Sequence, residues 1–155
     1  DSSIRPNQIY AVSLPHTMLT KEQALQVINT VEEKLLAGPG IRSLSPDHKD
    51  YHGIYCGSLP KRDAAYHQGT AWGFLMGGFL TAYLKVHHHS PEAKKQALQY
   101  LAPVRTHLFE EGCIGSISEI FDGDAPHTCR GCYAQAWSVG EILRCYTQDI
   151  QKNQK

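Results

Sequence analysis

The sequence predicts an all-α fold, and two observations carry that prediction. Apolar residues recur at helical spacing in stretches that begin at capping residues such as Thr20 and Ser90. No segment shows the alternation of apolar and polar residues that is typical of a half-buried strand. We therefore expect helices joined by loops throughout residues 1–155, as one domain.

Two helices are predicted in the first forty residues. Pro6 can stand in the first turn of a short helix that reaches about Leu14, because that position needs no backbone N–H. Thr20 and Gln23 have the spacing of a capping box, and apolar residues follow them at helical spacing. The turn residues 38–40, Gly-Pro-Gly, should end this second helix.

A long loop is predicted over residues 38–62, and a loop of that length in a compact domain usually carries function or covers a site. A helix over about 68–86 should follow, with Gly69, Gly73 and Gly77 spaced so that another helix can approach closely. Its uncharged run is short and rich in glycine for a membrane span. We expect a buried helix instead.

The remaining chain predicts two further helices and a polar loop. Ser90 and Pro91 are a typical start for a helix that reaches about Glu110. A loop over residues 112–130 comes next, and a last helix should run over about 131–149.

Composition narrows the classes of partner. The 15 basic residues balance the 15 acidic ones, so the chain has no net field to attract polyanions or anionic lipid. We expect no nucleic-acid and no membrane partner, and a neutral ligand fits better. The five cysteines are odd in number and irregularly spaced, which favours reduced thiols in the cytoplasm. No secretion signal is recognisable.

The stretch from Gly115 to Ser138 is the richest in polar chemistry. It sets carboxylates, a histidine, an arginine and a tryptophan around an apolar pair, in a loop broken by glycine and proline that leads into a helix. Such a loop is typical of a site that binds hydroxyl groups and moves protons. The alternative is a solvated turn built on Asp122-Gly123-Asp124.

Four segments of the chain resemble the C-terminal part of the amylo-α-1,6-glucosidase domain of glycogen debranching enzymes. They occur in the family's order and are RPNQIYAVSLP (5–15), RDAAYHQGTAW (62–72), SISEIFDGDAPH (116–127) and RGCYAQAWSV (130–139). The resemblance implies that the helices are hairpins forming about half of an (α/α)6 toroid. A half-ring would expose apolar helix faces, so we expect a homo-oligomer or completion by the missing part of the catalytic domain.

The resemblance implies hydrolysis of α-1,6-glucosidic branch points in glycogen or a related α-glucan, by an inverting mechanism. Glu119 occupies the place of the catalytic base that activates water. The family's proton donor lies in a Trp-Met-Asp type of segment, which this sequence lacks. Asp63 is a poor replacement, because its neighbour Arg62 should keep it ionised. We expect this chain alone to be a poor enzyme.

Six other residues are predicted to serve sugar binding or its surroundings. His67 and Gln68 can hydrogen-bond hydroxyl groups, and Trp72 offers an apolar face to a pyranose, with core packing as its alternative. By resemblance, Tyr55 borders the sugar site and Trp137 supports Glu119 from behind. Asp124 is expected to shape the loop, because Asp-Gly-Asp favours a tight bend. For Tyr55 loop anchoring remains the alternative, and for Trp137 it is core packing. Gly73-Phe74 departs from the family pattern, which usually has Pro-Trp there.

Two patterns of possible metal ligands are weaker evidence for a site. Cys129 and Cys132 have the spacing of a zinc half-site, and His87 to His89 form a cluster. A structural zinc site needs a second pair of ligands, and histidines at a helix end are favoured by the helix dipole. We expect no metal and no cofactor.

A second class of function remains open at this point. The chain could be a helical module without catalytic activity that binds oligosaccharide or associates with itself.

Overall fold

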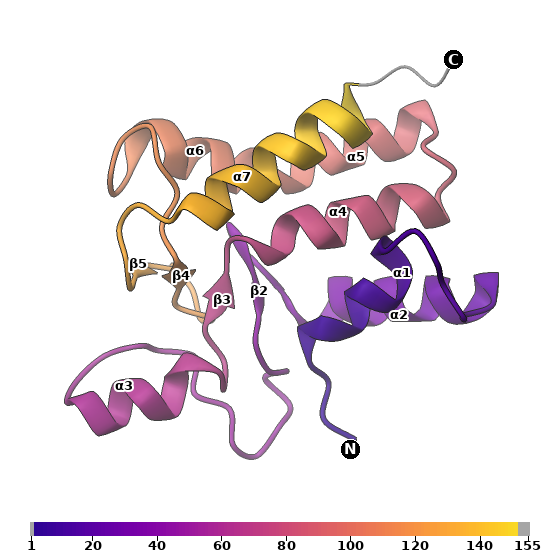
Figure 1. Cartoon of the computed structure of the whole chain (residues 1–155). Coiled ribbons are helices and arrows are strands. Elements are labelled where there is room, and N and C mark those ends of the chain that lie inside the picture. The colour runs from indigo at the N-terminus through magenta and orange to yellow at the C-terminus, as the bar shows by residue number, and fades with distance from the viewer. Residues whose placement is uncertain (1, 152–155) are drawn as a thin grey trace.

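The structure is a computed structural model that describes residues 2–151, so both ends of the predicted domain 1–155 lie outside the described residues (Figure 1). The helical elements are η1 (Pro6–Ile9), α1 (Tyr10–Ser13), α2 (Lys21–Lys34), α3 (Leu59–Tyr66), α4 (Leu75–Val86), α5 (Pro91–Tyr100), α6 (Ala102–Glu110), α7 (Ala136–Cys145) and the π-helical turn η2 (Tyr146–Ile150). The strands are β1 (Leu36–Ala37), β2 (Gly40–Arg42), β3 (Ala71–Trp72), β4 (Ile120–Phe121) and β5 (Cys129–Arg130).

Helix α2 confirms the sequence prediction closely. The Gln23 backbone N–H donates to the Thr20 hydroxyl, and the Thr20 N–H donates to the Gln23 side chain, so both halves of the capping box form. The helix ends at Lys34, a few residues before the predicted stop. Its buried face packs on α4.

The prediction of an all-α fold is wrong in one respect, because the chain also forms a five-stranded antiparallel sheet in the order β1-β2-β3-β4-β5. Each strand is only two or three residues long, which is too short for an alternating pattern to show in the sequence. The sheet pairs Trp72 with Ile120, and Ile120 with Arg130. Two segments that were predicted to carry function are therefore joined by backbone hydrogen bonds.

Several predicted boundaries need correction for related reasons. The helix predicted over 68–86 begins only at Leu75, because the residues before it form β3. The predicted loop 38–62 contains β2 and the start of α3. The helix predicted to reach Glu110 is divided at Leu101, where Pro103 in the first turn of α6 cannot donate to the preceding turn. The last α-helix begins at Ala136.

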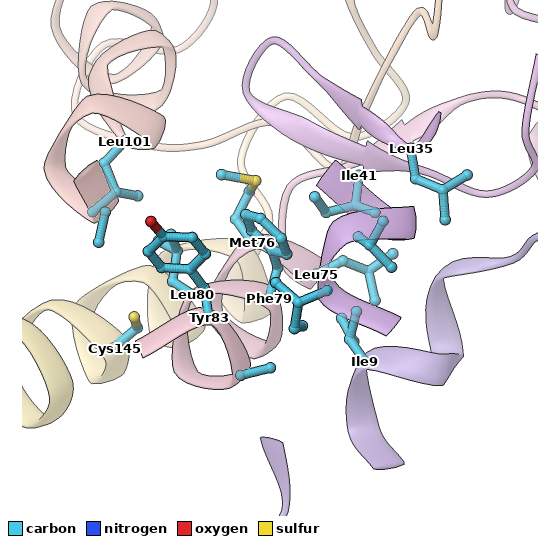
Figure 2. Packing of buried hydrophobic residues seen from close by; sticks show 14 of the residues in the cluster. Ile9, Leu35, Ile41, Leu75, Met76, Phe79, Leu80, Tyr83, Leu101 and Cys145 are labelled. Atoms are coloured by element: carbon cyan, nitrogen blue, oxygen red, sulfur yellow. The ribbon is translucent and has the colours of Figure 1, made fainter. Parts of the chain in front are cut away.

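The hydrophobic core surrounds α4, which lies across the middle of the molecule with α7 and α1 against it (Figure 1). Met76, Phe79 and Leu80 are fully buried and meet Ile9, Leu35, Ile41, Leu101 and Cys145 from other elements (Figure 2). Burying one such side chain contributes about 1.5–3 kcal/mol. The predicted buried helix is confirmed for this stretch. Over residues 2–151, no helix is long and apolar enough to span a bilayer.

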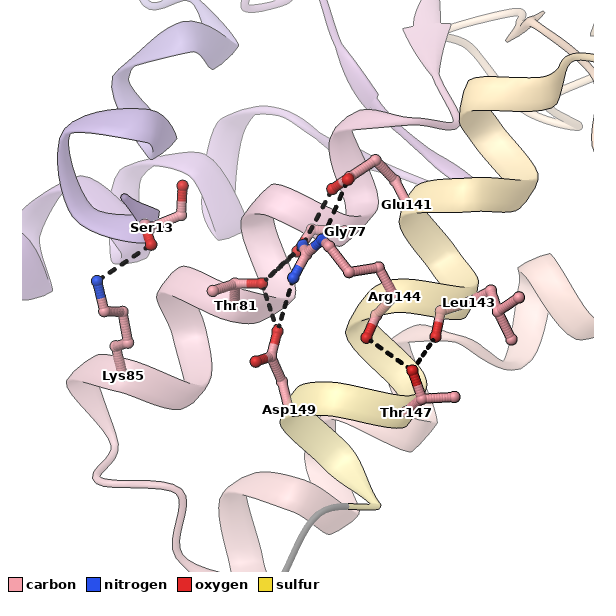
Figure 3. A network of polar contacts seen from close by, with 9 residues as sticks. All are labelled: Ser13, Gly77, Thr81, Lys85, Glu141, Leu143, Arg144, Thr147 and Asp149. Carbon is pink, nitrogen blue, oxygen red and sulfur yellow. Dashed lines mark hydrogen bonds and ion pairs between the residues drawn. The ribbon is translucent and has the colours of Figure 1, made fainter. Parts of the chain in front are cut away.

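A polar network joins α4 to α7 and η2 beside this core (Figure 3). The Thr81 hydroxyl donates to Asp149 Oδ2 at 2.6 Å, and the Arg144 guanidinium donates to Thr81, Glu141 and Asp149. Of the three glycines predicted to allow a close approach, only Gly77 lies on α4. A Cβ there would stand 2.8 Å from the Glu141 carbonyl oxygen, so glycine is what lets α7 come so near.

Candidate functional site

Glu119 lies directly before β4 and is held through both of its carboxylate oxygens. The Tyr66 hydroxyl donates to Oε1 at 2.5 Å, and the Cys132 backbone N–H donates to Oε2 at 2.9 Å. Burial and the hydrogen bond to Glu119 raise the pKa of Tyr66, so the phenol stays a proton donor. The two hydrogen bonds fix the orientation of the carboxylate.

Asp122 organises the loop that follows Glu119. Its side chain is 3% exposed, and Oδ2 accepts from Arg130 Nε and Nη2 at 3.1 and 2.9 Å. The other oxygen accepts from the Tyr55 backbone N–H at 2.8 Å. The hydrogen bond to Asp122 raises the pKa of Arg130. Arg130 therefore pairs with this loop through Asp122.

The 51–55 segment docks onto the same acidic loop. The Tyr51 hydroxyl donates to Asp124 Oδ1 at 2.8 Å, while Asp124 itself is exposed. A Cβ on Gly53 would stand 2.4 Å from the Asp124 carboxylate, so the loops are in close contact. The Tyr55 ring lies 5.8 Å from the Tyr66 ring. Tyr55 is thereby placed near Glu119 through Tyr66, whereas Asp124 contacts Tyr51 and Gly53.

Aromatic rings form a wall beside Tyr66. Trp72 lies 4.8 Å from Tyr66 edge to face, and His67 stacks on Trp72 at 5.1 Å with only 4° between the ring planes. Trp72 is 5% exposed, so most of its apolar surface is already covered. Trp137 is 47% exposed and stacks on Phe74 at 4.3 Å. Of the two tryptophans, Trp137 is therefore the more open to a ligand.

A pocket of about 280 Å³ opens along this wall. It is lined by Arg5, Pro6, Asn7, Ser43, His67, Trp72, Phe74, Leu75 and Trp137. Gln68 lies at its edge, where Arg5 Nη2 donates to the Gln68 carboxamide oxygen at 2.6 Å. The pocket brings together His67, Trp72 and Trp137 from the predicted set, whereas Glu119 touches the wall through Tyr66.

Three residues of this region had no predicted role. Tyr66 lies within the segment 62–72 that resembles the family, but its contact with Glu119 spans 53 positions of sequence and therefore leaves no local signal. Arg5 similarly donates to the carbonyl oxygen of His67 at 2.9 Å across 62 positions of sequence. Phe74 departs from the family pattern and still supplies a second aromatic surface.

The comparisons with known proteins decide the family. The sequence model described as amylo-alpha-1,6-glucosidase matches residues 1–144. This chain belongs to the amylo-alpha-1,6-glucosidase family. It is 30% identical over 163 aligned positions to the glycogen debranching enzyme of Saccharomyces cerevisiae. The match covers 92% of this chain and 10% of that relative, so the chain spans about a tenth of the relative's length.

Within this amylo-alpha-1,6-glucosidase segment, the other predicted groups lie as follows. Asp63 is exposed on α3, and the Arg62 guanidinium lies 5.9 Å from the Tyr55 ring centre. Cys129 and Cys132 are unpaired in the structure, as are the other three cysteines. In the part of the chain that is described, no group of three or more histidine, cysteine or acidic residues is placed to hold a metal ion.

Proposed function

We propose that this chain is the C-terminal catalytic portion of an amylo-α-1,6-glucosidase, with residues 1–155 as one domain of helical hairpins from an (α/α)6 toroid. It would hydrolyse α-1,6-glucosidic branch points of glycogen or a related α-glucan. The observation that carries the proposal is the carboxylate of Glu119, held on two sides next to an aromatic pocket. The five unpaired cysteines fit a cytoplasmic setting.

In this proposal Glu119 is the general base. A base must be aimed at the water it deprotonates, and the donors on both carboxylate oxygens fix that direction. Each carboxylate oxygen keeps a further lone pair for that water. An inverting enzyme places its acid about 6.5–9.5 Å from its base, on the other face of the sugar. We assign the acid to a group outside this chain.

The sugar would lie along the pocket wall. Trp137 and the edge of Trp72 supply apolar surface for a pyranose face, and the imidazole of His67 supplies a polar partner for hydroxyl groups. Gln68 would present its NH₂ group, because Arg5 occupies its oxygen. Tyr55, on the docked 51–55 segment, and Asp124, on the acidic loop, would border the site.

The test compares this chain with a longer polypeptide that contains the preceding part of the family domain. We expect residues 1–155 to release at most trace glucose from a limit dextrin. The longer polypeptide should release glucose as the β-anomer, which NMR can identify. Release of the α-anomer would overturn the inverting mechanism. Efficient hydrolysis by the short chain, abolished by Asp63→Asn, would show that the acid lies here after all.

A second candidate function is self-association, and one surface favours it. An apolar groove of about 620 Å³ lies between α5–α6 and α7, and its lining includes Leu98, Phe109, Leu143 and Tyr146, all of them exposed. Two copies could bury these residues against each other. Light scattering should then give a dimer that Leu143→Glu dissociates and that Leu59→Glu, at an exposed leucine outside the groove, leaves intact. A monomer at high concentration would remove this candidate.

A further inference from the structure

A second polar cleft lies at the opposite end of α4 from the aromatic pocket. It has a volume of about 590 Å³ and is lined by residues of α2, the end of α4, the turn after it and α5, namely Glu32, Tyr83, Val86, His87, His88, Ser90, Glu92, Ala93, Gln96 and Tyr100. Because α4 has 12 residues, its two ends are about 18 Å apart. None of these residues contributes to the site around Glu119.

A hydrogen bond and packed rings order the groups that line this cleft. The Tyr100 hydroxyl donates to Glu32 Oε1. Tyr83 and Tyr100 meet edge to face at 5.4 Å, and the His87 ring lies 4.4 Å from the Tyr83 ring. Packing therefore fixes the rotamers of the groups that a ligand would meet.

The rim of the cleft is held in an unusual backbone conformation. His88 and His89 have φ values of 54° and 49°, in the left-handed region that residues with a side chain rarely adopt. The His88 backbone N–H donates to the Lys85 carbonyl oxygen at 3.1 Å, and the His89 N–H donates to the Leu84 carbonyl oxygen at 2.8 Å. This turn keeps the His87 and His88 side chains at the edge of the cleft.

The lining selects the chemistry of a ligand. It contains no lysine or arginine, so it offers no cation for a phosphate or another anion. Its apolar share is small, which gives an acyl chain little to contact. Carboxylate, imidazole, carboxamide and hydroxyl groups together provide both donors and acceptors, which suits a neutral ligand rich in hydroxyl groups.

We propose that this cleft is a second α-glucan-binding site, separate from the aromatic pocket. The choice of an α-glucan rests on the proposed function, whereas the preference for a neutral polyhydroxylated ligand rests on the lining alone. A branched polymer could contact both ends of α4 at once, and the second contact would then raise its apparent affinity through effective concentration.

The experiment is a titration of the isotope-labelled chain with maltoheptaose, read by two-dimensional NMR. We expect two separate groups of shifted amides, one around Tyr100 and one around Trp137. Gln96→Ala should weaken binding at the cleft about three- to tenfold, because one hydrogen-bonding group is lost. Gln99→Ala is the matched control, since Gln99 is exposed on the same helix and does not line the cleft. His87→Ala is a second variant, to be used if Gln96→Ala does not fold.

The outcomes separate the two proposals. Shifts around Trp137 alone would overturn the second site and leave the proposed function standing. Shifts around Tyr100 alone would support the cleft and count against the pocket as a sugar site. Equal effects of Gln96→Ala and Gln99→Ala, or equal binding of the β-linked cellohexaose at the cleft, would also overturn the inference.

Discussion

Two glutamates in this molecule accept a hydrogen bond from a tyrosine hydroxyl, and they differ in what surrounds them. Glu119 precedes a strand, accepts a second hydrogen bond from the Cys132 backbone and adjoins an aromatic wall. Glu32 projects from α2 into an open cleft, towards Tyr100 on α5. The pairing of a glutamate with a tyrosine is therefore no signature of catalysis by itself.

The difference lies in which partner can move. A backbone N–H in a strand connection cannot rotate away, so it fixes the direction of the Glu119 lone pairs. The hydroxyl that donates to Glu32 belongs to the Tyr100 side chain, whose position depends on ring packing rather than on the backbone. A reaction needs the first kind of environment, and a binding surface tolerates the second.

The largest expected effect is on catalysis, and its absence would remove the difference between Glu119 and Glu32. Glu119→Gln keeps the shape of the side chain and removes its basicity, so hydrolysis by the longer polypeptide should fall about 10²- to 10⁴-fold. Glu110→Gln, an exposed change at the end of α6, is the control and should retain the rate. A rate indifferent to Glu119→Gln would remove the base assignment and leave the two glutamates equivalent.

Next in size is the stability of the acidic loop. Asp122→Asn removes a carboxylate that is 3% exposed and that accepts two hydrogen bonds from the Arg130 guanidinium, and should lower the free energy of unfolding by about 1–3 kcal/mol. Urea denaturation followed by circular dichroism measures this value. Asp63→Asn, at an exposed position on α3, should change it by less than about 0.5 kcal/mol. Similar values for both variants would show that the loop does not depend on the pair.

A comparable effect is expected where α4 and α7 meet. Gly77→Ala would place a Cβ 2.8 Å from the Glu141 carbonyl oxygen and should cost about 1–3 kcal/mol. At Gly140 an added Cβ meets nothing within 4 Å, so Gly140→Ala should stabilise α7 by about 0.5–1 kcal/mol. Thermal melts of the two variants should therefore shift in opposite directions, and a shift in the same direction would contradict the close approach.

The smallest expected effect concerns tyrosine ionisation. Burial and then the hydrogen bond to Asp124 raise the pKa of Tyr51 to about 12, from 10.0. A raised pKa means that the folded state keeps the proton longer. The contribution of Tyr51 to the free energy of unfolding is therefore complete below pH 10 and is lost as the pH rises towards 12.

Asp124→Asn tests the minor cause of this shift. Removing the carboxylate should lower the pKa of Tyr51 only part of the way towards its ordinary value, because burial is the larger cause. Titration of tyrosinate by ultraviolet absorbance would measure the change. An unchanged titration curve would show that the hydrogen bond does not reach the Tyr51 phenol in solution.

Local signals predicted the elements that depend on neighbours in sequence. Thr20 and Gln23 are three positions apart, and Ser90 with Pro91 marks the start of α5, so the caps could be located without knowledge of the fold. The strands could not, because β3 and β4 are two residues each and exist only through pairing between Trp72 and Ile120. Their stability comes from distant partners, and their sequences carry no period.

The candidate site divides in the same way. The sequence by itself determined the family through four ordered segments, and with it the expectation that Glu119 is the base. Only the tertiary structure decided that Tyr66 holds Glu119 and that Trp137, rather than Trp72, is the exposed ring. The physical reason is that hydrogen bonding and exposure depend on which distant surfaces meet, whereas caps and motifs are properties of a continuous stretch of chain.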